Sequence, residues 1–111
     1  MIKLNQVYDL LKKVGVPVTY KQFSGSTQDI PDPPYIVYYE TRSNNIGADN
    51  IVYKEMLPVI VELYTDRCRS LELERSIKKL LTGAGLYFNT DHGDVPEEDV
   101  HIAYFEFSII E

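Results

Sequence analysis

Residues 57–66 read LPVIVELYTD and residues 70–86 read SLELERSIKKLLTGAGL, and together these stretches decide the fold. In the first, every second side chain is a branched aliphatic one, which is the period of a β-strand with one face toward a core. In the second, the apolar side chains recur at offsets of four, seven, eight and eleven positions, the stripe of an amphipathic helix. Ser70 is the expected cap of this helix, and Gly83 and Gly85 supply the permissive backbone of a helix end. We therefore expect a strand and a helix that each bury one apolar face.

A second helix is predicted over residues 4–14, because its apolar side chains share one face. Asn5 is its expected cap, and Gly15 is its expected end. Pro17 confines the following strand, residues 16–23, to a sheet edge or to the first residues of the strand. Alternating and β-branched stretches predict four more strands, which are residues 35–41, 51–53, 87–88 and 100–110.

Three polar stretches separate these elements and are predicted to be loops: residues 24–34, 42–50 and 89–99. The chain has no internal repeat and no linker that would divide it. Two helices and several hairpin-linked strands predict an α+β fold. We expect a single domain over residues 1–111, in which an antiparallel or mixed β-sheet carries both helices on one face.

The composition argues against several classes of protein. A net charge of -6 does not suit general affinity for nucleic acid, which needs a basic face. No apolar run is long enough to cross a bilayer. The one cysteine, Cys68, cannot form an internal disulfide, which fits synthesis in the cytoplasm. Arg67 and Arg69 flank this thiol and favour its thiolate form, but no positioned base accompanies it, so we do not expect a nucleophile.

The sequence offers few candidates for catalytic or metal-binding residues. His92 lies in an Asp-His-Gly-Asp stretch that is typical of an exposed turn, although it places carboxylates beside an imidazole. His101 begins the last strand on its apolar side, where a position at the sheet edge explains it. A metal site needs further nitrogen or thiolate ligands at set spacings, and the sequence does not supply them. We expect no catalytic, metal-binding or cofactor-binding residues.

Tyrosine and glutamate recur on the strand faces that we expect to point away from the helices. On each of three strands, a tyrosine and a glutamate lie two positions apart and share this face: Tyr38 and Glu40, Glu62 and Tyr64, and Tyr104 and Glu106. These could be the wet face of a sheet, a partly buried contact with another subunit, or paired carboxylates of a hydrolase, and we favour the first two together. The candidate contact face is Tyr38, Glu40, Ile60, Glu62, Tyr64, Ile102, Tyr104 and Glu106, with Ile36 on the same side. The candidate contact loop holds Asn44, Asn45, Asp49 and Asn50.

A family resemblance covers nearly the whole chain. It rests on PPYIVYYE at residues 33–40, ADN at residues 48–50, VELYTD at residues 61–66 and YFEF at residues 104–107. The series resembles small structural proteins from the head–tail gene clusters of long-tailed phages and prophages of Gram-positive bacteria. Family members often continue with a charged or proline-bearing turn after Thr-Asp, where this chain has RCRS at residues 67–70.

The resemblance implies a non-enzymatic role as a tail-completion or tail-terminator protein. Such proteins form rings, typically hexameric, on the tail tube at the head–tail junction of the virion, after synthesis in the host cytoplasm. The partners would be copies of the chain itself, the tail-tube protein and the head–tail connector proteins. A negative charge suits a ring through which DNA must slide. The alternatives are a neighbouring neck or minor capsid component, or an acidic module that binds a host protein.

Overall fold

The computed structural model describes residues 3–21, 32–41, 44–48, 51–66, 70–95 and 100–110, with the backbone alone at residues 44–48, 51–55, 95 and 110. Two helices and six strands lie within these ranges. In chain order they are α1 (Leu4–Lys12), β1 (Val18–Tyr20), β2 (Tyr35–Glu40), β3 (Asn44–Ala48), β4 (Ile51–Asp66), α2 (Leu71–Gly83), β5 (Phe88–Val95) and β6 (Val100–Ile110).

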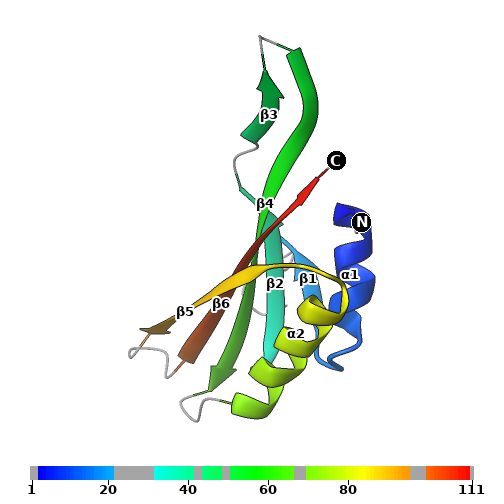
Figure 1. Ribbon diagram of the computed structural model, residues 1–111. Coiled ribbons are helices and arrows are strands. Elements are labelled where there is room, and N and C mark those ends of the chain that lie inside the picture. Colours follow the sequence, from blue (N-terminus) through cyan, green and yellow to red (C-terminus); the bar gives the residue numbers. More distant parts are fainter. Residues whose placement is uncertain are drawn as a thin grey trace.

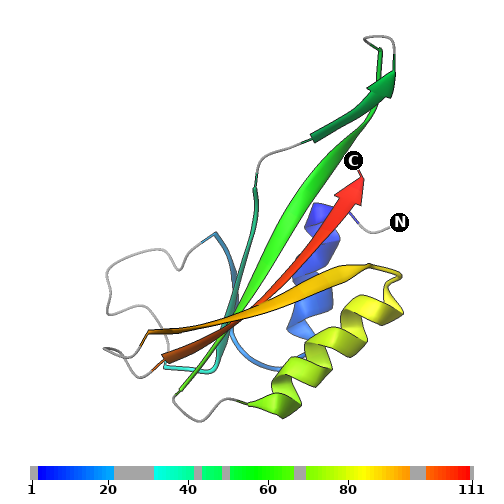
Figure 2. The same cartoon turned by 60° about the vertical axis from the view of Figure 1, so that its left-hand side comes forward.

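The six strands form one mixed sheet. Five of them follow the order β1-β2-β4-β6-β5, and β3 pairs with β4 beside this path. Strand β1 runs parallel to β2, and every other pairing is antiparallel. Figures 1 and 2 show α1 and α2 on the same side of the sheet, and they show β3 with the start of β4 projecting beyond the rest as a ribbon. The predicted α+β fold, with both helices on one face, is confirmed.

The hydrophobic core lies between the helices and the sheet. Burial of apolar area on both elements is the main force that holds them together. The fully buried apolar side chains that the helices contribute are Val7 and Leu11 on α1 and Ile77 and Leu81 on α2. The central strands contribute Val59, Val61, Leu63, Phe105 and Phe107 to the same core. The alternation predicted for residues 57–64 and 100–110 is therefore confirmed on its core side.

The boundaries of α2 follow from its capping residues, as the sequence predicts. Ser70 Oγ accepts a hydrogen bond from the Leu73 backbone N–H at 3.3 Å, which satisfies one of the free donors at a helix start. Gly85, with φ of 77°, takes the left-handed conformation past the helix end. The prediction of Asn5 as the cap of α1 is wrong, because that helix already begins at Leu4.

Three stretches differ from the predicted secondary structure. Residues 44–48, predicted as part of a turn, form β3 and pair with the start of β4. Strand β4 is one continuous strand of 16 residues rather than two separate strands. Residues 89–95, predicted as a loop, belong to β5 and pair with β6 along its length. For β3 and β5, backbone pairing with a neighbouring strand outweighs the polar composition, which edge strands tolerate.

We expect Ile77→Ala to lower the free energy of unfolding by about 2–5 kcal/mol, because it opens a cavity between α2 and the sheet. Lys79→Ala on the exposed side of the same helix is the matched control, and its expected effect is within about 0.5 kcal/mol. Urea denaturation followed by circular dichroism measures both. Equal effects of the two substitutions would contradict the packing of α2 on the sheet.

Candidate functional site

The candidate site is the side of the sheet that faces away from the helices, which we call the outer face. Strand register defines it, because directly paired residues of antiparallel strands point to the same side. Glu62 of β4 pairs with Val37 of β2 and with Tyr104 of β6, and all three alternate with residues of the core. The outer face consists of Tyr35, Val37, Tyr39, Ile60, Glu62, Tyr64, Ile102, Tyr104 and Glu106.

Glu62 is the centre of this face. Its Oε2 accepts a hydrogen bond from the Tyr39 hydroxyl, and its Oε1 accepts one from the Tyr64 hydroxyl, each at 2.7 Å. The Tyr64 ring in turn stacks on the Tyr35 ring, with 4.7 Å between centroids and 12° between planes. Hydrogen bonds to an ionised acceptor are stronger than neutral ones. A single carboxylate therefore fixes the orientation of two phenols on neighbouring strands.

The same arrangement changes the acidity of the phenols. Burial raises the pKa of Tyr39 and of Tyr64 above the ordinary value, and the hydrogen bond to Glu62 raises each of them further. Burial also raises the pKa of Tyr104, with contributions from the negative charges of Glu62 and Asp91. A phenolate would stand beside a carboxylate in each case, so all three side chains remain hydroxyl donors over the ordinary pH range.

Burial varies across the outer face. Val37 and Ile102 are nearly inaccessible, at 8% and 7% exposure. The aromatic side chains around Glu62 and the side chain of Ile60 are partly buried, whereas Glu106 is exposed. Tyrosines that combine apolar area with a polar tip are typical of contacts between proteins. The outer face is thus more apolar than the wet side of an ordinary half-exposed sheet.

Two residues of the predicted contact face do not belong to it. Tyr38 pairs with Val61, lies on the helix side and is 4% exposed. Glu40 is also on the helix side, where it accepts a hydrogen bond from the Tyr20 hydroxyl and lies 3.6 Å from Lys21 Nζ. The hydrogen bond from Tyr20, supported by the charge of Lys21, lowers the pKa of Glu40. Burial and that same bond raise the pKa of Tyr20 to about 12.

The error arises from the sequence of β2. Residues 35–39 are all aromatic or β-branched, so the period of two does not show which of them face the core. A shift of one residue transfers every side chain to the other face. Ile36, also predicted on the contact face, is fully buried on the helix side, and Tyr39 takes the place expected for Tyr38.

The three carboxylates of the hydrolase hypothesis do not lie on one face of the sheet. Glu62 and Glu106 lie on the outer face, and Glu40 lies on the other side of the sheet. The predicted set of Glu40, Glu62 and Glu106 on one face is therefore wrong. The other predicted contacts on this face, which are Ile60, Glu62, Tyr64, Ile102, Tyr104 and Glu106, do lie together.

The predicted contact loop is described only in part. Asn44 and Asn45 belong to β3, and the structure describes their backbone alone. Asp49 and Asn50 lie outside the described residues, and so does Cys68.

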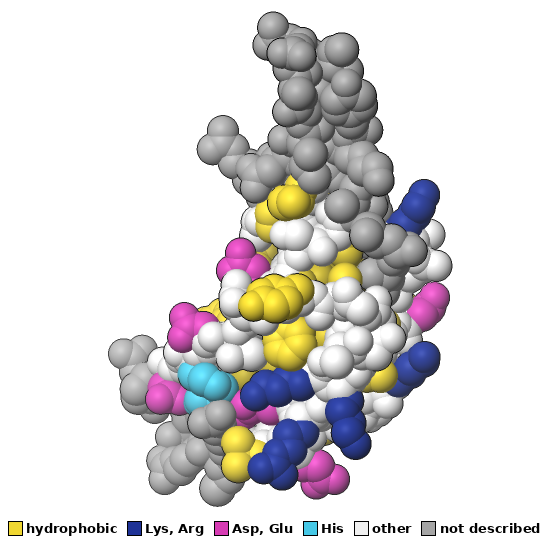
Figure 3. Space-filling model, viewed as in Figure 1, with side chains coloured by type: hydrophobic (Ala, Val, Ile, Leu, Met, Phe, Trp, Pro, Cys, Tyr) yellow, Lys and Arg dark blue, Asp and Glu magenta, His cyan; other side chains and the backbone are white. Residues whose placement is uncertain are grey.

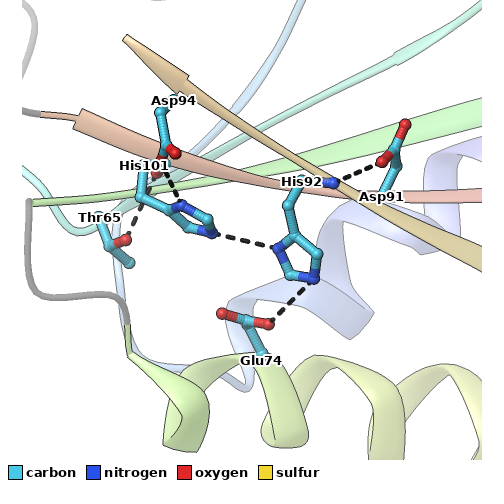
Figure 4. Close-up of polar contacts among 6 residues, drawn as sticks. All are labelled: Thr65, Glu74, Asp91, His92, Asp94 and His101. Carbon is cyan, nitrogen blue, oxygen red and sulfur yellow. Dashed lines mark hydrogen bonds and ion pairs between the residues drawn. The ribbon is translucent and has the colours of Figure 1, made fainter. Parts of the chain in front are cut away.

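A second cluster of ionisable side chains lies on the helix side, and the sequence did not predict it. His92 is not in a turn but in β5, where it pairs with Ala103 and faces the helices. Its Nδ1 lies 3.1 Å from His101 Nε2, and its Nε2 lies 3.9 Å from Oε1 of the buried Glu74 (Figure 4). The other ring nitrogen of His101, Nδ1, lies 2.7 Å from Asp94 Oδ1.

The sequence did not predict this cluster because residues 89–95 were expected to form a loop. Once residues 88–95 are recognised as a strand antiparallel to β6, the register places Asp94 opposite His101 and brings His92 alongside. The many turn-forming residues of that stretch concealed the strand. His101 lies in an inner strand rather than at the sheet edge, which corrects the explanation that its position suggested.

Comparison with known proteins leaves the family open. The chain matches no family model, and it matches no curated protein. Among the described residues, no helix has both the length and the apolar character needed to cross a membrane.

We expect Glu62→Gln to lower the free energy of unfolding by about 1–3 kcal/mol. Glutamine keeps the shape, but its amide nitrogen cannot accept a hydrogen bond, so one of the two tyrosine hydroxyls loses its acceptor. Glu106→Gln is the matched control on the exposed part of the same face, with an expected effect within about 0.5 kcal/mol. Chemical denaturation measures the free energy of unfolding of both variants. Equal losses of this free energy would contradict the central role of Glu62.

Alkaline pH should destabilise the protein through Tyr39 and Tyr64. Their folded-state pKa lies above the unfolded value of about 10. The native state therefore keeps these protons after the unfolded chain has lost them, and the stabilisation is complete below about pH 10 and is lost as the pH rises further. The Tyr39→Phe and Tyr64→Phe double variant should lose stability less steeply above pH 10.

Thermal unfolding at a series of pH values measures this slope, and the ultraviolet absorbance of phenolate follows the titration directly. If all nine tyrosines of the native protein ionised together with those of the urea-unfolded chain, the proposed burial of these phenols would be wrong.

Proposed function

We propose that this chain is a non-enzymatic structural protein of a long-tailed phage that completes the tail by forming a ring on the tail tube at the head–tail junction. The sequence resemblance motivates the proposal. The observation that carries it is the outer face, a patch of tyrosine and isoleucine around one fixed carboxylate. Both helices lie on the opposite side, and no described helix or strand covers this patch (Figure 2).

The outer face has the composition of a subunit contact. The partly buried side chains of Ile60 and of the tyrosines provide apolar area that is removed from water on association. Tyr39, Glu62 and Tyr64 are held by one another before any partner arrives. Side chains that are already ordered lose less entropy on binding. A second copy of the chain is the partner that we assign to this face.

The ribbon of β3 and β4 supplies a second point of contact. Pairing between β4 and β6 begins at Met56, so among the described strands residues 51–55 pair with β3 alone. An isolated two-stranded ribbon is marginally stable, and support from a neighbouring molecule would compensate for this. A ribbon that reaches from one subunit to the next makes a head-to-tail contact, and such contacts close into a ring when the rotation per subunit divides a full turn.

The surface charge is compatible with a DNA conduit. The net charge of -6 disfavours binding to phosphates. Lys and Arg side chains nevertheless gather over α2, on the side seen in Figure 3. These charges lie on the helix side of the sheet and so leave the outer face to the tyrosines and carboxylates. We propose that the helices support the outer face from the other side of the sheet.

Ile60→Lys should disrupt assembly, because it places a charge in the middle of the outer face. We expect at least a tenfold weaker association, measured by sedimentation velocity and electron microscopy of the protein at high concentration and mixed with tail-tube protein. Tyr87→Lys is the matched control. Tyr87 is 91% exposed and precedes β5, outside the outer face, so this variant should assemble as the unmodified protein does.

A wild-type protein that stays monomeric and also fails to bind tail tubes and connectors would overturn the proposal. Monomers that assemble only on the tube would support it. Capture of one stoichiometric host protein, without affinity for virion proteins, would replace it by the host-binding alternative. Thermal unfolding of both lysine variants establishes that each one is folded before its assembly is compared.

A further inference from the structure

Glu74, His92 and His101 converge from three separate elements on the helix side of the sheet (Figure 4). One nitrogen of each histidine and one oxygen of Glu74 lie within 4.8 Å of one another. Glu74 is 2% exposed and His101 is 8% exposed. Two of the three side chains are thus largely removed from water, and buried ionisable groups in proteins are hydrogen-bonded, paired or bound to a metal.

The orientation of His101 determines what it can bind. An ionised Asp94 can only accept hydrogen bonds, so His101 Nδ1 donates to Asp94 Oδ1 at 2.7 Å. The neutral ring then presents the lone pair of Nε2, and that atom lies 3.1 Å from His92 Nδ1. A histidine whose second nitrogen donates to a carboxylate is the usual arrangement around protein-bound metals, where the outer carboxylate fixes the ring and strengthens the ligand.

We propose that Glu74, His92 and His101 bind one divalent transition-metal ion, with zinc as the best match. Imidazole and carboxylate ligands suit zinc, whereas calcium and magnesium prefer sites made of oxygen alone. A tetrahedral zinc ion with bonds of about 2.0–2.1 Å separates its ligand atoms by roughly 3.3 Å. The two histidine nitrogens already stand near that spacing, and the Glu74 oxygen lies within 4.8 Å of its partners.

The site combines a fixed part with an accessible part. Glu74 and His101 are buried, but the His92 side chain is 36% exposed. Figure 3 shows a histidine at the surface, between acidic side chains and the basic side chains over α2. Coordination would require rotation of the His92 ring and a shift of the Glu74 carboxylate toward the two histidine nitrogens. Three protein ligands leave the fourth position to water.

The metal would join helix α2 to the β5–β6 hairpin. Glu74 belongs to α2, His92 to the edge strand β5, and His101 to the inner strand β6. Ligands from three elements that meet only in the folded chain make metal binding a contribution to folding stability. The metal site is independent of the proposed assembly, because the cluster lies on the helix side of the sheet and the proposed subunit contact lies on the outer face.

The experiment uses untagged full-length protein that has been treated with a chelator and then titrated with zinc chloride in a calorimeter. We expect one ion per chain and a melting temperature that rises with zinc concentration. His92→Ala and Glu74→Gln should each weaken zinc affinity at least tenfold. Glu72→Gln is the matched control, because it makes the same chemical change in the first turn of the same helix, on its exposed side.

Cobalt titration of the wild-type protein gives a readout that does not depend on any variant. Four-coordinate cobalt has intense visible bands, and six-coordinate cobalt in water has weak ones. Stoichiometric binding with intense bands supports the site. The absence of stoichiometric binding to wild-type protein, or equal zinc affinity of the His92→Ala and Glu72→Gln variants, would overturn it.

Discussion

The antiparallel pairing of β4 with β6 is the constraint on which the rest of the structure depends. It runs without a break from Met56 opposite Ile110 to Asp66 opposite Val100. Because neither strand has a bulge there, the alternation of the two strands stays in phase over the whole length. One side of the pair is apolar and receives both helices, and the other side carries Glu62 and its tyrosines. Strands β2 and β5 extend this division outward on either side.

The two candidate sites are consequences of that division. On β6, Tyr104 and Glu106 point to the outer face, whereas His101 points to the helices. The outer face is broad, partly apolar and held by hydrogen bonds between side chains of the sheet. The histidine cluster is compact and depends on a helix for its third member, Glu74. A broad face suits a macromolecular partner, and a compact set of lone pairs suits an ion.

Sequence reasoning succeeds where local pattern and tertiary structure agree. The strand at residues 57–66, helix α2 with its Ser70 cap, and β6 with its bounds all follow from periodicity and end signals. It fails for β2 because a continuous run of aromatic and β-branched residues does not show which side chains face the core, so the prediction for Tyr38 and Glu40 is wrong. It fails for β3 and β5 because their polar residues form strands only when a neighbouring strand supplies backbone partners.

The candidate site illustrates the same limit. Glu62 and Tyr64 lie two positions apart on one strand, so their contact can be inferred from the chain. The contact of Tyr39 with Glu62 requires the register of β2, and the histidine cluster requires both the β5 register and the position of α2. Distances between elements are set by packing, and packing is not local in sequence.

The continuity of β4 has a mechanical consequence. The strand that forms one side of the ribbon passes through the sheet between β2 and β6. Its hydrogen bonds to both neighbours run across the strand direction. A pull on the ribbon along β4 would therefore load these bonds in shear, all at once, rather than peel them apart one after another. Any tension that a neighbouring molecule exerts on the ribbon would be carried directly into the most buried part of the protein.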